Sequence, residues 1–165
     1  MGEPTIRERF LQEAARFVRA AGAISGVRRI AVIGSIVTDK PDPKDIDLLV
    51  TVTDDADLAP LASCARRLQG RLQGLNHTAD VFLADERGRY LGRTRHWRDC
   101  RPGIRRACDA LNCGRRQYLH DDLSTITLGT VTIEAARVQV WPQVKRYGPV
   151  PADVERFLEA LQHAA

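Results

Sequence analysis

An eight-residue run, DIDLLVTV from Asp45 to Val52, constrains the fold of this chain most strongly. Its apolar and β-branched residues are typical of a buried strand. A similar run from Val27 to Gly34 precedes it, and the ten residues between the two runs contain Pro41 and Pro43. A third run, Thr78 to Asp85, has the same character. The sequence therefore predicts three neighbouring strands in the first half of the chain.

Helical segments separate and flank these strands. Apolar residues recur every three or four positions from Pro4 to Ala23 and from Leu58 to Leu72, which predicts two amphipathic helices. Two β-rich pieces in 124–141, expected to form edge or hairpin strands, precede a closing helix that opens at Pro151. With 165 residues, we expect one domain of the α/β (α+β) class, in which helices flank a small mixed sheet.

Positive charge is concentrated in one segment. Residues 87–116 hold ten arginines and two aspartates, a net charge of +8, so the rest of the chain carries −4 of the total of +4. We expect turns and one short helix, Ile104 to Leu111, in this arginine-rich segment. It either forms a groove for a triphosphate or an RNA-like acceptor, or is an ordinary solvated face.

The N-terminal residues lack the basic segment and apolar core of a secretory signal. No apolar run approaches the roughly 20 residues that a membrane-spanning helix needs. We therefore expect a cytoplasmic protein with no membrane contact.

Two aspartates lie on one face of the predicted strand from Asp45 to Val52. Residues i and i+2 of a strand point to the same side, so Asp45 and Asp47 are neighbours, while Ile46 and Leu48 face the core. Adjacent carboxylates repel unless a cation lies between them, and Lys44 can neutralise only one. A pair of Mg²⁺ or Mn²⁺ ions would satisfy them. The alternatives are a solvated strand start for Asp45 and an exposed edge strand for Asp47.

Two further features complete this candidate site. Asp80 lies on the next predicted strand, where it could join the metal ligands and accept a proton from an attacking hydroxyl. Gly34 and Ser35 follow the first strand, where a glycine lets the backbone approach a ligand and the following N–H groups can bind phosphate.

These residues resemble the DNA polymerase β-like nucleotidyltransferase superfamily, especially its small single-domain (minimal nucleotidyltransferase) members. The match consists of an apolar strand ending in Gly34-Ser35, a nine-residue spacer, Asp45-Ile-Asp47, and Asp80 at the place of the family's third carboxylate. It covers the motif core, residues 27–83, within a single domain spanning 1–165; the arginine-rich segment 87–116 and the C-terminal part 124–163 follow.

The resemblance implies transfer of a nucleoside monophosphate from a nucleoside triphosphate, such as ATP, to a hydroxyl acceptor with two Mg²⁺ ions. Asp45, Asp47 and Asp80 would be the catalytic metal ligands, and Gly34 and Ser35 would bind the triphosphate. The acceptor is open: a small molecule, a protein or RNA. Small family members often work with a helical partner subunit, so either such a partner or a homo-oligomer is expected.

The chain departs from the family pattern after Ser35. Small members often carry Ala-Arg-Gly there, whereas this chain reads Ile36-Val-Thr-Asp-Lys40. We expect only a short helix at this point, with Lys40, Lys44 or a distant arginine contacting the phosphates. The alternative function is a non-catalytic module on the same fold that binds nucleotide, nucleic acid or a partner protein.

Cysteines offer a second, separate metal hypothesis. Cys100, Cys108 and Cys113, with His96 or His120, are enough ligands for Zn²⁺. No Cys-x-x-Cys pair is present, however, which favours buried free thiols over a zinc site.

Overall fold

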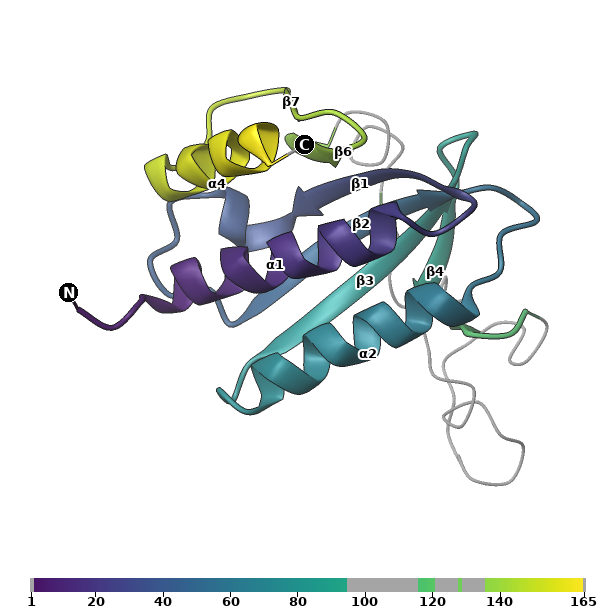
Figure 1. Ribbon diagram of the computed structural model, residues 1–165, viewed down its shortest axis with the longest axis horizontal. Helices are drawn as coiled ribbons and strands as arrows, with labels where there is room; N and C mark the ends of the chain where they lie inside the picture. The colour runs from purple at the N-terminus through teal and green to yellow at the C-terminus, as the bar shows by residue number, and fades with distance from the viewer. Residues whose placement is uncertain (1, 95–115, 121–127, 129–135, 165) are drawn as a thin grey trace.

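Within residues 2–94, 116–120, 128 and 136–164, which the computed structural model describes, the chain forms a mixed sheet of seven strands (Figure 1). The strands lie in the order β5-β4-β3-β2-β1-β6-β7. Their bounds are β1 Val27–Ile33, β2 Asp45–Val52, β3 Thr78–Asp85, β4 Tyr90–Thr94, β5 Leu119–His120, β6 Val138–Trp141 and β7 Lys145–Arg146. Strands β2 and β3 run parallel, and the other neighbouring pairs are antiparallel.

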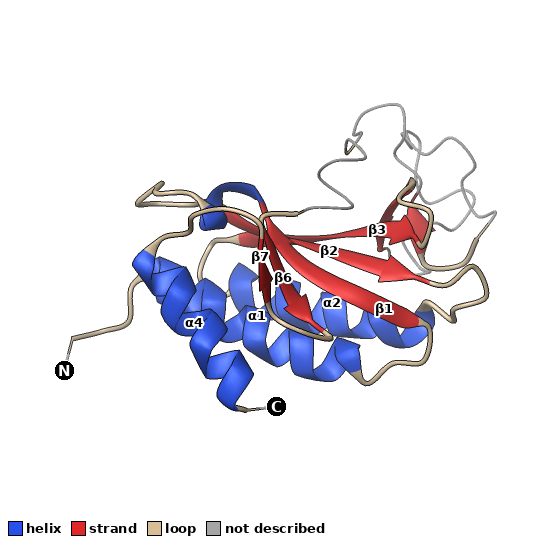
Figure 2. Cartoon of the chain, turned by 90° about the horizontal axis from the view of Figure 1, so that it is seen from above, coloured by secondary structure: helices blue, strands red, loops and turns tan. Residues whose placement is uncertain are grey.

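Helices cover one face of the sheet, as Figure 2 shows. They are α1 Ile6–Gly22, α2 Ala59–Gln73 and α4 Ala152–His163, while the short 3₁₀-helix η1 Gly34–Val37 follows β1. The main core lies between these helices and the sheet and includes the fully buried Phe10, Leu48, Leu68 and Leu83. A smaller apolar cluster, which includes Ala31, Leu49 and Phe82, occupies the opposite face.

Local sequence signals set the helix starts. Thr5 is the N-cap of α1: its hydroxyl accepts a hydrogen bond from the Glu8 N–H, and the Glu8 carboxylate accepts one from the Thr5 N–H. Pro4, at which the predicted helical pattern begins, lies before the cap. In α2, Pro60 lies in the first turn, and the Asp57 carboxylate accepts a hydrogen bond from the Ala59 N–H.

The β2-α2-β3 unit positions the aspartates. Because β2 and β3 are parallel, the chain needs a crossover, and α2 provides it. The register is continuous over eight residue pairs, from Asp45 opposite Thr78 to Val52 opposite Asp85. The apolar face of α2 is buried against the sheet through Leu61, Leu68 and Leu72. This packing fixes the alignment of the two strands.

The structure confirms the α/β class, the single domain and the elements predicted up to Asp85. Strand β4 corrects the expectation of turns throughout 87–116; Tyr90–Thr94 pairs with β3 in a hairpin closed by the turn at Asp85. Strand β6 falls in the second of the two β-rich pieces and lies inside the sheet rather than at its edge, because it forms a hairpin with β7, a strand that the sequence did not predict. The predicted helix Ile104 to Leu111 and the β-rich piece 125–134 lie outside the described residues, apart from Leu128.

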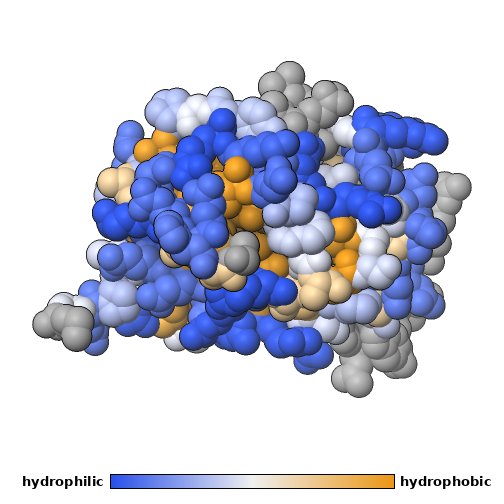
Figure 3. Space-filling view, turned by 45° about the horizontal axis from the view of Figure 1, so that its top comes forward, coloured by the Kyte–Doolittle hydropathy of each residue, from blue (hydrophilic) through white to orange (hydrophobic). Residues whose placement is uncertain are grey.

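The exposed side chains are mainly hydrophilic, as expected when most apolar residues are buried in the core. Figure 3 shows a mainly hydrophilic face on which hydrophobic side chains gather in small patches near the middle. Every helix in the described part of the chain is too short or too polar to cross a bilayer.

Two helical glycines should respond in opposite ways to substitution by alanine. A Cβ atom at Gly22 would lie 2.7 Å from Nε1 of Trp141, whereas one at Gly70 meets nothing within 4 Å. Gly22→Ala should lower the free energy of unfolding by about 1–3 kcal/mol through this overlap. Gly70→Ala should raise it by about 0.5–1 kcal/mol, the ordinary gain of alanine in a helix. Urea unfolding of the two variants checks both signs; a stabilising Gly22→Ala would contradict the packing described.

Candidate active site

Asp45, Asp47 and Asp80 lie on the face of the sheet opposite the helices. Their neighbours Ile46, Leu48 and Val81 point into the core beneath the helices, so alternation directs the aspartates to the other side. Asp47 is directly opposite Asp80 in the parallel register. The structure thus brings together the carboxylates that the sequence singled out. Since β2 lies between β1 and β3, the edge-strand alternative for Asp47 is wrong.

The surroundings of Asp47 disfavour its ionised form. Burial, followed by the negative charges of Asp45 and Asp80, raises its pKa from 3.8 to about 7. Among the described residues, no lysine or arginine forms an ion pair with Asp45 or Asp47. Lys44, which precedes them, has an exposed side chain, and its carbonyl oxygen lies 3.0 Å from Nδ1 of His77. Within the part of the chain that the structure describes, no side-chain cation balances the charge of this pair.

Gly34 allows the backbone to pass close to this carboxylate. It has φ of +78°, a conformation that favours glycine, and a Cβ atom there would overlap with Oδ2 of Asp47. The backbone of Gly34 is exposed, and Ser35 beside it is half-buried. The short helix expected after Gly-Ser is confirmed: η1 spans four residues and ends at Val37. Gly34 and Ser35 thus lie at the edge of the carboxylate cluster.

Asp80 has a partner that sequence reasoning did not single out. Nη1 of Arg93, on β4, donates a hydrogen bond to Oδ1 of Asp80 at 3.1 Å. The Asp80 side chain is 38% exposed. Arg93 belongs to the arginine-rich segment, but its place opposite Phe82 depends on the β3-β4 hairpin, which the sequence did not predict.

The donor set suits a hard divalent cation. Carboxylate oxygens are the ligands that Mg²⁺ prefers, and Mg²⁺ commonly uses one or two carboxylates, completing its shell with water and substrate phosphates. In the described part of the chain, no three His, Cys, Asp or Glu side chains form a group that could hold a metal ion. Asp45 and Asp47 therefore fit an ion shared with a phosphate-bearing substrate better than an ion held by protein alone.

His96, Cys100, Cys108 and Cys113, the zinc candidates, lie outside the described residues. His120 is fully buried on β5.

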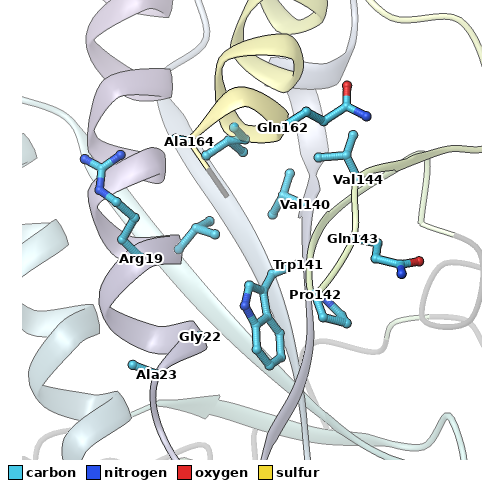
Figure 4. Close-up of a pocket in the computed structure, with 12 residues that line it drawn as sticks. Arg19, Gly22, Ala23, Val140, Trp141, Pro142, Gln143, Val144, Gln162 and Ala164 are labelled. Atoms are coloured by element: carbon cyan, nitrogen blue, oxygen red, sulfur yellow. The ribbon is translucent and has the colours of Figure 1, made fainter.

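A cavity of about 750 Å³ lies between α1, α4 and the turn after β6. Figure 4 shows Trp141 in this cavity, directed toward Gly22, with Val140 and Val144 nearby. It is on the helix side of the sheet, and none of its lining residues belongs to the carboxylate cluster.

Comparison with known families adds a classification. A model described as "Family of unknown function (DUF6932)" matches residues 1–121. This range contains all three clustered aspartates, Gly34 and Ser35. No curated protein sequence matches the chain.

The raised pKa of Asp47 predicts an unusual pH dependence of stability. Its pKa is about 7 in the folded protein and near 3.8 when unfolded, so the folded state holds more protons between these values. Without metal, the contribution of Asp47 to stability falls as pH rises from about 4 to 7. Asp47→Asn should therefore stabilise the protein at pH 8, by at most ~4 kcal/mol and by less where solvent screens the charge. At pH 5, where only the unfolded state is largely ionised, the stabilisation should be smaller, at most ~1.6 kcal/mol. Thermal unfolding in EDTA at both pH values measures this.

Asp85, at the end of the neighbouring strand β3, provides a control of opposite sign. Burial acts to raise its pKa, but hydrogen bonds from the N–H groups of Arg87 and Arg89 and from the Arg89 guanidinium hold the pKa below its usual value. Asp85→Asn should destabilise the protein at pH 8 by about 1–3 kcal/mol. If Asp47→Asn also destabilises at pH 8, the carboxylate repulsion inferred for Asp47 is wrong.

Proposed function

The chain belongs to the DUF6932 family, whose function is unknown, and we propose that it is a nucleotidyltransferase. It would move a nucleoside monophosphate from a nucleoside triphosphate to a hydroxyl acceptor. The observation that carries the proposal is the cluster of Asp45, Asp47 and Asp80 on one sheet face, where Asp47 is half-buried and has no cationic partner among the described residues. The resemblance of Gly34-Ser35 and Asp45-Ile-Asp47 to nucleotidyltransferases supports the same function.

Each aspartate has a distinct role in this proposal. Asp45 and Asp47 would hold Mg²⁺, which supplies positive charge to the phosphates and polarises the α-phosphate. The acceptor oxygen forms a bond to the α-phosphorus while the bond from that phosphorus to the bridging oxygen breaks, releasing pyrophosphate. Asp80 would take the proton of the acceptor hydroxyl. Because Arg93 binds Asp80, that ion pair must loosen when the acceptor arrives.

The phosphates would lie on the Gly34 side of the cluster. Gly34, whose backbone is exposed, and the hydroxyl of the half-buried Ser35 would contact an anionic group. Lys40 and Lys44 are both exposed and lie on the connection between η1 and β2. They would provide positive charge in place of the arginine that small nucleotidyltransferases often carry after Gly-Ser. The acceptor and any partner subunit stay open in this proposal.

One observation favours a second candidate, a nucleotide-binding module without catalysis. The Asp80 carboxylate is bound by Arg93 at 3.1 Å, which satisfies its charge without metal. If that ion pair persists with nucleotide bound, the chain would bind the triphosphate and leave the acceptor hydroxyl without a base. Measurements of transfer and of binding distinguish the two functions.

Label transfer tests the enzyme directly. The protein is incubated with Mg²⁺ or Mn²⁺, each α-³²P-labelled nucleoside triphosphate in turn, and cell extract as the source of acceptors. Labelled product should form with at least one nucleotide, and Asp47→Asn should reduce the rate by at least about 100-fold because it removes a metal ligand. Glu86→Gln is the matched control, since Glu86 is an exposed carboxylate paired with Arg28. Nucleotide binding without transfer under every condition would favour the module.

Metal binding should depend on pH. An ion bound by Asp47 must displace the proton that this carboxylate holds below a pKa of about 7. The association constant for Mn²⁺ should therefore fall by about tenfold per pH unit below pH 7 and level off above it. Calorimetric titration with Mn²⁺ between pH 5.5 and 8 gives the profile. Asp47→Asn should abolish the dependence and Glu86→Gln should retain it. A flat profile in the wild-type protein would exclude Asp47 as a ligand.

A further inference from the structure

Arg7, in the first turn of α1, binds the segment that follows Gly34 and Ser35. Its Nη2 donates to the carbonyl oxygen of Ile36 at 2.8 Å, and its Nη1 donates to that of Lys40 at 2.7 Å. The Arg7 side chain is only 11% exposed. One guanidinium thus contacts both ends of the five-residue segment 36–40.

The same guanidinium is anchored on α4. Its Nε donates to Oδ2 of Asp153 at 2.6 Å and its Nη2 to Oδ1 at 3.1 Å, a bidentate ion pair. Burial acts to raise the pKa of Asp153, but the hydrogen bond and charge of Arg7 outweigh it and hold the pKa below its usual value. Arg7 therefore ties α1, α4 and the segment 36–40 into one unit.

A second arginine, from the C-terminal part of the sequence, also binds this segment. Nη1 of Arg137, just before β6, donates to the carbonyl oxygen of Val37 at 3.4 Å. Within the segment, the hydroxyl of Thr38 donates to the carbonyl oxygen of Ser35 at 2.7 Å. The carbonyl oxygens of Ile36, Val37 and Lys40 are thus bound by side chains from distant parts of the sequence.

We propose that Arg7 is a positioning residue of the candidate active site. By holding the carbonyl oxygens of Ile36 and Lys40, it keeps the turn that begins at Gly34 packed against the carboxylate of Asp47. Only Ile36 and Val37 of the segment belong to η1, and Pro41 and Pro43 follow the segment. Its shape therefore depends on contacts from outside the segment. The inference rests on the proposed function, because it assigns this turn to nucleotide binding.

Arginine suits this role better than lysine. The planar guanidinium donates in several fixed directions, and here it reaches two carbonyl oxygens and both oxygens of a carboxylate. A lysine ammonium is a single point of charge that cannot make this set of contacts. Arg7→Lys should therefore keep the charge but release part of the segment.

Kinetics of Arg7→Lys test the inference. If the segment holds the phosphates equally in the ground and transition states, its release should raise KM for the nucleoside triphosphate by about tenfold or more, while kcat changes by less than about threefold. Asp153→Asn, which leaves the arginine in place, should act in the same direction but less strongly. Arg16→Gln is the control on the same helix: Arg16 is 55% exposed and pairs only with Glu13 among the described residues. It should leave KM unchanged.

Hydrogen exchange provides a readout that needs no activity. Amide exchange in 36–40 should accelerate by about tenfold or more in Arg7→Lys, with little change in β2 and β3. All variants are compared well below their unfolding temperatures.

The outcomes separate the two proposals. Label transfer by the wild-type protein with unchanged KM in Arg7→Lys would overturn the positioning role and leave the proposed function standing. Faster exchange in 36–40 of Arg7→Lys, with no transfer and no nucleotide binding by the wild-type protein, would show that Arg7 holds the segment and would overturn the proposed nucleotidyltransferase function. A lowered melting temperature with unchanged exchange in 36–40 and unchanged KM would reduce Arg7 to a structural residue.

Discussion

The parallel pairing of β2 with β3 is the constraint on which the candidate site depends. It sets Asp47 opposite Asp80, and alternation along β2 adds Asp45 on the same face. Repulsion among these charges opposes the pairing. The buried side chains on the other face, such as Leu48 and Val81, pack beneath α1 and α2 and outweigh it. The sheet can therefore tolerate a cluster of charge because its opposite face supplies the stability.

Two carboxylates on β3 show how position within one strand decides a chemical role. Asp85, at the end of the strand, is buried but accepts hydrogen bonds from the turn to β4, so its charge is satisfied within the protein. Asp80 faces Asp47 and has one arginine partner. Asp47 has no such partner among the described residues, and its charge is the least stable of the three. A satisfied carboxylate stabilises a fold, whereas an unsatisfied one is available to a ligand.

The turn after β1 is held by a different kind of interaction. The carboxylate cluster depends on strand register, but the segment 36–40 depends on Arg7 and Arg137, which donate to its backbone carbonyl oxygens. Such contacts join residues about 30 and 100 positions apart. They place the end of β1 against β2 without requiring a regular helix.

The sequence by itself determined the strands around the site, the crossover helix and the three aspartates, because hydrophobic periodicity and local capping are short-range signals. It also indicated a short helix after Gly34. Tertiary structure alone decided that Arg93 binds Asp80 and that Arg7 holds the turn, since arginines in a sequence carry no sign of their partners. Strand β4 was missed for a similar reason: Tyr90–Thr94 becomes a strand by pairing with β3. Long-range contacts, which depend on how elements pack, lie beyond what local pattern can specify.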